Sequence, residues 1–398
     1  MTALRRLLSA CAFAALLPLA PANGLAADPA PVLIGLDAEF GHLTSTSDDA
    51  IRMGILTAID EINAAGGVLG GRRLELVTRD NRSIPARGVD NATELASIPE
   101  LVAFFTGKFS PVALEQTKIL GQLKLPMLDP WAAADEIVPE KPAGSWAFRL
   151  SLRDSWAIPA MAAYLRGRKV ERMGVLLVTS GWGRSNEANL QRHTAAGGQP
   201  AVAATEWYSW GAKTLLPAVQ KLRAAGAQAI LFVGNEGEGS TLVREMASLP
   251  ADQRLPIVSH WGITGGNFLE LTGDALATVD FAVVQTFTFE GLNSPRARQV
   301  TARAARLFGL RGGAREIPSH VGFAHAYDLT HILARALRLA GSTDRAAVRD
   351  ALERVRDYDG LVDRFPQPFS AASHEALAPR HVFIGRFTRA GTVERIRR

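Results

Sequence analysis

Apolar and polar positions alternate over the first hundred residues in the pattern of a strand, a helix and a second strand. An apolar run at 32–36 precedes a polar loop, Asp37 to Asp48, and another β-rich run follows at 74–77. Between them, isoleucines recur at spacings of four, four and three: Ile51, Ile55, Ile59 and Ile62. These spacings place them on one face of a helix, whose first turn Thr46 or Ser47 can cap. We therefore expect a parallel strand–helix–strand unit, with a ligand met by the loop that leaves the first strand.

The chain continues in the same way towards position 130. The sequence predicts helices over 85–97 and 110–123 and strands at 101–105 and 125–128. Ser110-Pro111 is a strong helix start, with serine as the cap and proline in the first helical position. The loops 106–110 and 129–133 should therefore join the first loop around one crevice. Free N–H groups at helix amino ends there favour an anionic group on the ligand.

The pattern then starts again, which indicates a second α/β lobe. The predicted elements are a helix at 155–167, a strand at 173–178, the loop 179–184 with a helix to 196, a strand at 202–207, a helix at 215–225, a strand at 229–233, a helix at 242–249 and a strand at 256–258. A strand at 279–286, helices at 319–340 and 344–355, and a hairpin from 382 follow. The fold class is thus α/β, with two lobes that each hold a mainly parallel sheet flanked by helices.

Composition supports a folded, exported protein. A chain of 398 residues exceeds what one hydrophobic core usually organises, and 47% hydrophobic with 21% charged residues is ordinary for a globular protein. Residues 1–27 have the basic start, apolar run and small residues of a cleavable signal peptide, so we expect an exported protein. A membrane anchor is the alternative, but the apolar run is short for one. Cys11 is the only cysteine, so the mature protein would have no disulfide.

Charge and motifs exclude several functions. The formal charge of +5 becomes 42 − 39 = +3 once Arg5 and Arg6 are removed, which is too weak to indicate nucleic-acid binding. Neither the Gly-x-Ser-x-Gly elbow, the phosphate-binding loop nor His-Glu-x-x-His occurs. The spacing of His320, His325 and His331 does not gather them on one helix face, so we expect no metal and no cofactor. A secreted α/β enzyme with scattered catalytic residues remains an alternative.

At this point the sequence resembles a known family. The stretch 58–72, Ala-Ile-Asp-Glu-Ile-Asn-Ala-Ala-Gly-Gly-Val-Leu-Gly-Gly-Arg, followed by 74–77 and Asp80, is similar to type I periplasmic solute-binding proteins of ABC importers, in the branched-chain amino-acid group. Residues 222–229 and the pair Tyr327-Asp328 are similar to the same family. The resemblance implies two lobes that close on a small molecule, permease subunits as partners, and a monomer. A subunit that senses a ligand for a membrane receptor is the alternative role.

The resemblance also implies where the chain crosses between lobes. Three crossovers are expected, near 147–150, 285–289 and 359–365. Lobe 1 would then comprise 28–147 with 288–360, and lobe 2 would comprise 148–287 with 361–398.

For the ligand site, this chain departs from the pattern of family members that hold amino acids. Only Ser110 keeps a hydroxyl in the loop 107–111, whereas Trp182 matches an aromatic that often lies on the ligand. The expected ligand-binding residues are Phe40, His42, Lys108, Phe109, Ser110, Trp131, Ala132, Ser180, Trp182, Asn235, Glu236, His260 and Trp261. We expect a small carboxylated solute, aromatic or amphipathic, whose carboxylate pairs with Lys108 and whose body is covered by indoles.

Several of these residues have an ordinary structural interpretation as well. Lys108 can point to solvent, and Trp131 can be part of the wall of the first lobe. Trp261 can belong to the core or the hinge. Glu236 and Glu238 can receive an ammonium group or form a solvated pair of carboxylates.

Overall fold

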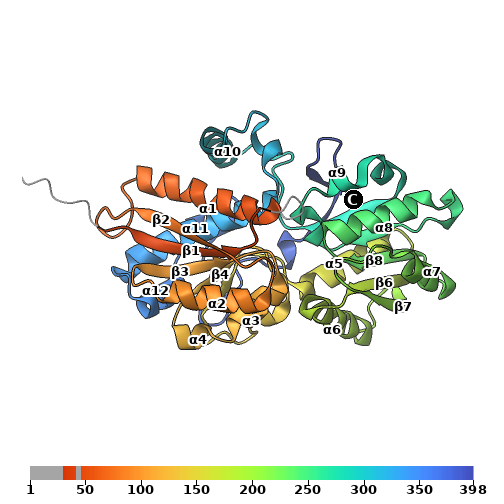
Figure 1. Cartoon of the computed structure of the whole chain (residues 1–398), viewed down its shortest axis with the longest axis horizontal. Helices are drawn as coiled ribbons and strands as arrows, with labels where there is room; N and C mark the ends of the chain where they lie inside the picture. Colours follow the sequence, from red (N-terminus) through yellow and green to blue (C-terminus); the bar gives the residue numbers. More distant parts are fainter. Residues whose placement is uncertain (1–29, 42–45, 398) are drawn as a thin grey trace, which may run out of the picture.

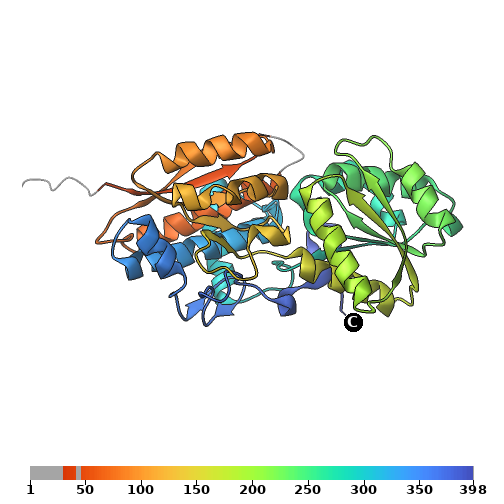
Figure 2. The same ribbon diagram turned by 90° about the horizontal axis from the view of Figure 1, so that it is seen from below.

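The computed structural model describes residues 30–41 and 46–397 and consists of two α/β lobes side by side (Figures 1 and 2). The first sheet has the order β2-β1-β3-β4-β5, and all its pairs are parallel. Its strands are β1 (Val32–Ala38), β2 (Leu74–Asp80), β3 (Leu101–Thr106), β4 (Met127–Asp129) and β5 (Ala147–Arg149). The predicted strand–helix–strand unit is confirmed, with Val32 opposite Leu74.

The helix after β1 is held by its isoleucine face, as the spacing predicts. All four isoleucines of α1 (Thr46–Ala64) are buried, and the helix packs on α11 (His320–Ala340). A side chain at Gly54 would place its Cβ 2.2 Å from the Phe323 carbonyl oxygen, so only glycine permits this close approach of the two helices. Helix α11 is therefore packed directly against α1, the helix that follows the first predicted ligand loop.

The remaining helices of the first lobe follow the prediction with two differences. They are α2 (Pro85–Ala96), α3 (Ser110–Thr117), α4 (Leu120–Leu123), α10 (Pro295–Phe308) and α12 (Arg345–Leu352), with short 3₁₀ turns η1 (Asp135–Ile137) and η5 (Gly313–Glu316). The predicted helix at 110–123 is interrupted after Thr117, and α10 was not predicted. Ser110 is not the cap of α3 either, because the helix begins at this residue.

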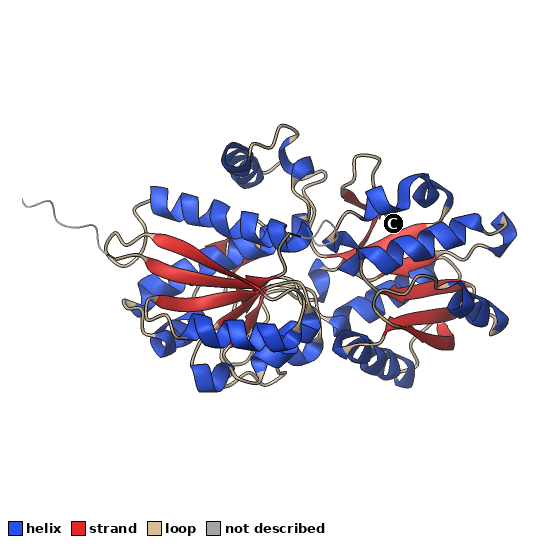
Figure 3. Ribbon diagram, in the orientation of Figure 1, coloured by secondary structure: helices blue, strands red, loops and turns tan. Residues whose placement is uncertain are grey.

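The second lobe contains a sheet of order β14-β13-β10-β9-β8-β6-β7. Its strands are β6 (Arg172–Val178), β7 (Ala201–Tyr208), β8 (Ala229–Val233), β9 (Ile257–Ser259), β10 (Phe281–Gln285), β13 (Phe383–Phe387) and β14 (Val393–Arg395). The five strands from β10 to β7 are parallel, whereas β13 and β14 are antiparallel. Both sheets are flanked by helices (Figure 3), as the fold class requires.

Two helices of this lobe start earlier than the sequence suggested. The helices are α5 (Asp154–Gly167), α6 (Gly181–Ala195), α7 (Leu216–Ala224), α8 (Glu236–Ser248) and α9 (Phe268–Thr272), with 3₁₀ turns η2 (Ala251–Gln253), η3 (Trp261–Gly265) and η4 (Gly273–Thr278). Ser180 caps α6 by accepting from the Gly183 N–H, so the predicted loop to Arg184 is helical from Gly181. α8 begins at Glu236 rather than at 242, because acidic residues suit its positive end despite the glycines.

The crossings between the lobes are tied together by a buried ion pair. β5 belongs entirely to the first sheet, so the chain leaves this sheet after Arg149. The buried Arg149 guanidinium lies 2.6 Å from a Glu375 carboxylate oxygen, on the segment that returns from the small hairpin β11 (Tyr358–Asp359) and β12 (Arg364–Phe365) towards β13 and η6 (Pro379–His381). The precise lobe boundaries stay predictions.

Candidate functional site

Asp48 joins the two loops that leave β1 and β3. Its carboxylate accepts hydrogen bonds from the Glu39 N–H at 2.9 Å and the Lys108 N–H at 2.7 Å. Burial raises the pKa of Asp48 to about 6, although Lys108 and the two N–H groups oppose this shift. The backbone of Lys108 is therefore fixed to the first turn of α1, and its side chain leaves from a defined position.

Ser110 and Asp129 fix the loop that carries Trp131. The Ser110 hydroxyl accepts from the Ala133 N–H at 3.2 Å, which explains why it does not cap α3. The Asp129 carboxylate accepts from the N–H groups of Trp131 and Ala132, at 2.9 and 2.7 Å. Ala132 thus contributes its backbone to this loop and does not line the cleft described below.

The two lobes meet through an indole pair and an ion pair. Trp131 of the first lobe stacks on Trp261 of the second, with ring centroids 5.0 Å apart and planes inclined by 28°. Lys108 Nζ lies 3.5 Å from Glu236 Oε1, and both side chains are buried. Burial raises the pKa of Glu236, an effect that Lys108 reduces. The contact across the lobes is therefore both aromatic and ionic.

Trp182 is held from the second lobe by Asp154 and His260. Trp182 Nε1 donates to Asp154 Oδ1 at 3.1 Å, and the His260 ring packs edge-on against the indole. His260 Nδ1 accepts from the Trp261 N–H, so the proton of the neutral ring lies on Nε2, 3.0 Å from Asp154 Oδ1. Trp182 lies in the first turn of α6 and is buried, so the helix and not a loop holds its indole.

Eleven residues around this contact line a small hollow, which we call the interlobe cleft. They are Lys108, Phe109, Ser110, Pro111, Trp131, Ala133, Trp182, Trp210, Asn235, Trp261 and Gly262. The hollow has a volume of about 10 Å³, which is no more than a single water molecule needs. The structure thus brings seven of the predicted residues together, but their own side chains fill the space between them.

Other predicted residues lie elsewhere. The Phe40 ring is covered by the Arg52 guanidinium on the first lobe, and Ser180 serves as the cap of α6. Neither lines the cleft. His42 falls outside the described residues. His260 supports Trp182, and Glu236 reaches the cleft through Lys108.

Ser47 and Gly265 are site residues that the sequence did not single out for ligand binding. A Cβ at Gly265 would lie 3.3 Å from both Ser47 Oγ and Glu236 Oε2, and 3.5 Å from Lys108 Nζ. Within the described part of the chain, Ser47 Oγ and Glu236 Oε2 have no hydrogen-bond partner, although both are buried. Buried oxygens without a donor are costly, so this junction of the two lobes is suited to a ligand with N–H groups. The sequence assigned Ser47 only a capping role.

A further set of contacts closes the lobes beside the cleft. Asp135 of η1 accepts from Asn189 Nδ2 at 2.9 Å and from Arg192 Nη2 at 3.2 Å, both on α6. Burial opposes ionisation of Asp135, but Arg153 and the hydrogen bonds hold its pKa below the usual range. Hydrogen bonds from α6 to Asp135 therefore hold the two lobes together outside the cleft as well.

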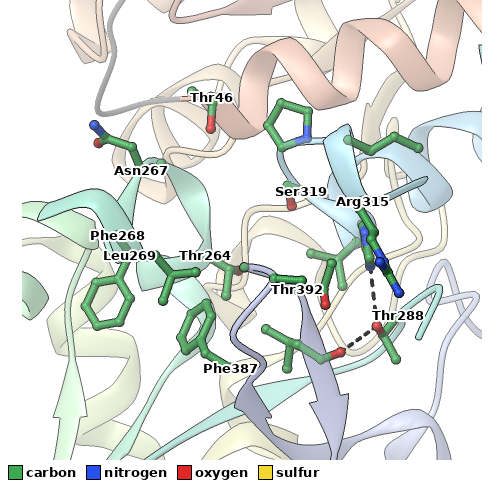
Figure 4. A pocket seen from close by; sticks show the side chains of 18 of the residues that line it. Thr46, Thr264, Asn267, Phe268, Leu269, Thr288, Arg315, Ser319, Phe387 and Thr392 are labelled. Carbon is green, nitrogen blue, oxygen red and sulfur yellow. Dashed lines mark hydrogen bonds between the residues drawn. The ribbon is translucent and has the colours of Figure 1, made fainter. Parts of the chain in front are cut away.

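A second and larger hollow, the hinge-side cavity, lies between the same lobes (Figure 4). Its volume is about 490 Å³. It is lined by the start of α11, by η3 and α9, by the end of β10 and by the turn between β13 and β14. Its lining shares no residue with that of the interlobe cleft.

Two features are absent from the described residues, a cluster of metal-ligand side chains and a membrane-spanning helix. Within 30–41 and 46–397 no group of three or more histidine, cysteine, aspartate or glutamate side chains is arranged to hold a metal ion. None of the helices in these ranges combines the length and apolar character that a membrane crossing requires.

Comparison with known proteins agrees with this architecture. Residues 32–392 match the family described as periplasmic binding protein. The chain is 25% identical over 351 residues to Leu/Ile/Val-binding protein homolog 3 of Brucella melitensis, covering 87% of this chain and 88% of that protein.

Two solved structures share the fold. A type 1 periplasmic binding protein from Bordetella pertussis has a TM-score of 0.81 at 21% identity, over 92% of this chain and 100% of its own. The branched-chain amino acid transporter substrate binding protein LivJ of Streptococcus pneumoniae, solved in complex with isoleucine, has a TM-score of 0.75 at 18% identity with the same coverage.

Proposed function

The chain belongs to the periplasmic binding protein family, and from this premise we propose that it captures an amino-acid-like solute in the interlobe cleft and delivers it to an ABC importer. The general role, a periplasmic solute-binding protein of the ABC-transporter type, comes with the family. The nature of the solute, the contact residues and a cleavable signal peptide over 1–27 are part of the proposal.

The observation that carries the proposal is the ion pair between Lys108 and Glu236. Each lobe places one charged side chain of opposite sign into a buried position, 3.5 Å apart. A solute with both a carboxylate and an ammonium group can insert between them, its carboxylate on Lys108 and its ammonium on Glu236. Glu236 Oε2 and Ser47 Oγ, which have no partner in the described residues, would then accept the ammonium protons.

The remaining residues of the cleft favour a flat or amphipathic body on the solute. The stacked indoles of Trp131 and Trp261 and the buried Trp182 offer aromatic faces on both lobes. Because the closed cleft has room for about one water molecule, the solute must enter when the lobes separate and the indoles part. The second lobe then adds its contacts only on closure, so the bound solute favours the closed state that an importer can recognise.

Three related compounds test the pairing of charges. We expect phenylalanine to bind in isothermal titration calorimetry more tightly than 3-phenylpropanoate, which lacks the ammonium group, and 2-phenylethylamine, which lacks the carboxylate. Lys108→Gln should weaken phenylalanine about tenfold, and Glu236→Gln should do so to a similar degree, because each removes a buried charge-assisted bond. Tryptophan fluorescence should change on binding, since Trp131 and Trp261 separate.

The control is Lys118→Gln, which removes an exposed lysine that pairs with Glu115 outside the cleft. It should leave the affinity unchanged. A cargo from a broader metabolite panel that carries no anionic group would contradict the assignment of Lys108. Recovery of chemically altered compound after incubation would contradict a binding function altogether.

A further inference from the structure

The hinge-side cavity is large enough for a small organic molecule. Its volume of about 490 Å³ lies in the range of about 300–1,000 Å³ that is usual for ligand pockets. Both lobes contribute to its lining, and strand β10 leads into it at the hinge. A molecule held there would contact both lobes at once, without displacing the side chains that fill the interlobe cleft.

One wall of the cavity is apolar. Phe268, Leu269 and Phe387, all from the second lobe, lie together on one side of it (Figure 4). The rings of Phe268 and Phe387 are in contact, with centroids 5.2 Å apart. Aromatic side chains in such an arrangement provide a surface for a ring-sized apolar group.

The facing wall provides hydrogen-bond donors and a positive charge. Ser319 and Arg315 lie on the side away from Phe268 and Phe387 (Figure 4). Ser319 caps the 21-residue helix α11, and its first residues, His320 and Val321, also line the cavity. The first N–H groups of a helix have no partner within it, and the positive end of the dipole favours an anion. The exposed Arg315 adds a full positive charge, and the exposed Glu270 among the lining residues carries a negative one.

His320 itself contributes no charge to this wall. Burial lowers its pKa to about 4, and its ring is held on both sides. Nδ1 accepts from the Phe289 N–H at 3.1 Å, and Nε2 lies 3.0 Å from the Ala314 carbonyl oxygen, to which it donates. The imidazole is therefore neutral at physiological pH and fixes the start of α11.

Gln285 is the independent sign of a ligand, because among the described residues only its Nε2 has a protein partner and its Oε1 has none. The side chain lines the cavity and is 2% exposed, and Nε2 donates to Thr264 Oγ1 at 3.3 Å. Within the described residues no donor reaches its Oε1. The neighbouring hydroxyl of Thr264 donates to the Trp261 carbonyl oxygen, so it offers only lone pairs to the cavity. This end of the cavity thus lacks a donor, which a ligand would have to supply.

We propose that the hinge-side cavity is a second binding compartment, which takes a ring-sized carboxylic acid that also carries a hydroxyl donor. The carboxylate lies at the start of α11 beside Ser319 and Arg315, the ring lies against Phe268 and Phe387, and the hydroxyl donates to Gln285 Oε1. The compartment is spatially separate from the interlobe cleft, since the two linings share no residue. A ligand there would favour the closed arrangement because it bridges both lobes.

4-Hydroxybenzoate is the probe for this compartment. In isothermal titration calorimetry we expect it to bind with one site per chain. Benzoate, which lacks the hydroxyl, and 4-hydroxybenzyl alcohol, which lacks the carboxylate, should each bind about tenfold more weakly, since each leaves one polar wall without its partner.

Two variants at exposed positions locate the site without endangering the fold. Ala390→Trp, in the turn between β13 and β14, places a large side chain at the mouth of the cavity and should weaken 4-hydroxybenzoate about tenfold or more. Arg315→Gln removes the cation and should weaken it about fivefold. The matched control Arg311→Gln changes an exposed arginine that does not line the cavity and should have no effect.

The outcomes separate this proposal from that of the interlobe cleft. Lys108→Gln should weaken phenylalanine more than 4-hydroxybenzoate, because it removes a direct contact of the first ligand and alters only closure for the second. Ala390→Trp should weaken 4-hydroxybenzoate and leave phenylalanine unchanged. Failure of 4-hydroxybenzoate and its two analogues to bind overturns the second compartment. Binding that is lost in Lys108→Gln and retained in Ala390→Trp and Arg315→Gln overturns it too, because the acid would then occupy the cleft.

Discussion

The interlobe cleft and the hinge-side cavity lie between the same two lobes and differ in what occupies them. The cleft holds an ion pair and stacked indoles in about 10 Å³ of free space, whereas the cavity has about 490 Å³ and a lining whose charged side chains, Arg315 and Glu270, are exposed. Because the side chains of the cleft leave almost no free volume, the lobes must separate before a solute can bind there. An existing hollow can be occupied in the closed arrangement, so the two sites respond differently to the same substitutions.

The largest difference should come from the indole pair. Trp131→Ala removes a side chain that is 2% exposed and stacks on Trp261, and we expect it to lower the free energy of unfolding by about 3–5 kcal/mol. It would also give the cleft the room that it lacks. Chemical denaturation measures the first effect, and calorimetric titration with phenylalanine measures the second.

Trp207→Ala is the matched control, since Trp207 on β7 is 36% exposed. It should cost far less stability than Trp131→Ala. Equal losses in the two variants would mean that the Trp131–Trp261 contact does not hold the lobes together in solution.

Much of the fold could be predicted from local patterns. The isoleucine face of α1, the buried run of β3 and the long helix predicted at 319–340 depend on residues close in sequence, and the structure confirms them. The early start of α8 was missed because Gly237 and Gly239 lower its helical propensity. Its acidic first turn and its contacts in the second lobe outweigh this preference.

The site was harder to predict, because its geometry depends on distant segments. Lys108 and Glu236 were recognised individually, but their pairing joins residues 128 positions apart. Ser110 was assigned to capping and cleft roles, and its bond to the Ala133 N–H depends on the next loop of the sheet. Gly265 has no functional side chain that a sequence pattern could reveal, and its place in the site follows only from its contact with Ser47. The whole hinge-side cavity arises from the packing of the lobes and has no local signal.

A smaller effect than that of the indoles is expected from the ion pair. Lys108→Met leaves the Glu236 carboxylate buried without its cation. This destabilises the closed form by about 1–3 kcal/mol, so the lobes separate and water reaches the carboxylate. We expect a larger radius of gyration in small-angle X-ray scattering at pH 7.5. The hinge-side cavity would lose its second wall in the open form, so 4-hydroxybenzoate should then restore compactness.

Lys118→Met provides the comparison, because Lys118 and Glu115 form an exposed pair on the surface of the first lobe. Exposed pairs contribute about 0–1 kcal/mol, so the scattering profile should not change. An unchanged profile in Lys108→Met as well would show that the ion pair does not influence closure.

The smallest effect concerns pH and distinguishes the cleft from the cavity by the titration of Glu236. Burial raises the pKa of Glu236 in the closed form, while in an open form water surrounds the carboxyl group and its pKa returns towards about 4.3. The closed form thus binds the proton more tightly. The raised pKa of Glu236 therefore favours closure of the unliganded protein at a pH below the ordinary pKa of a glutamate. This contribution is lost as the pH rises through the raised pKa of the closed form, and it amounts to about 1.4 kcal/mol for each pKa unit between the two forms.

Scattering between pH 4 and pH 8 measures this dependence, and Glu236→Gln should remove it. Asp48, with a pKa of about 6, titrates in the same range, but its hydrogen bonds lie within the first lobe, so it alters the stability of that lobe rather than closure. Glu238 and Lys108 are the other charged groups that act on Glu236, and both are kept in the variant. If the dependence persists in Glu236→Gln, another group at the interface controls closure, and the contrast between the buried ion pair of the cleft and the exposed charges of the cavity loses its functional meaning.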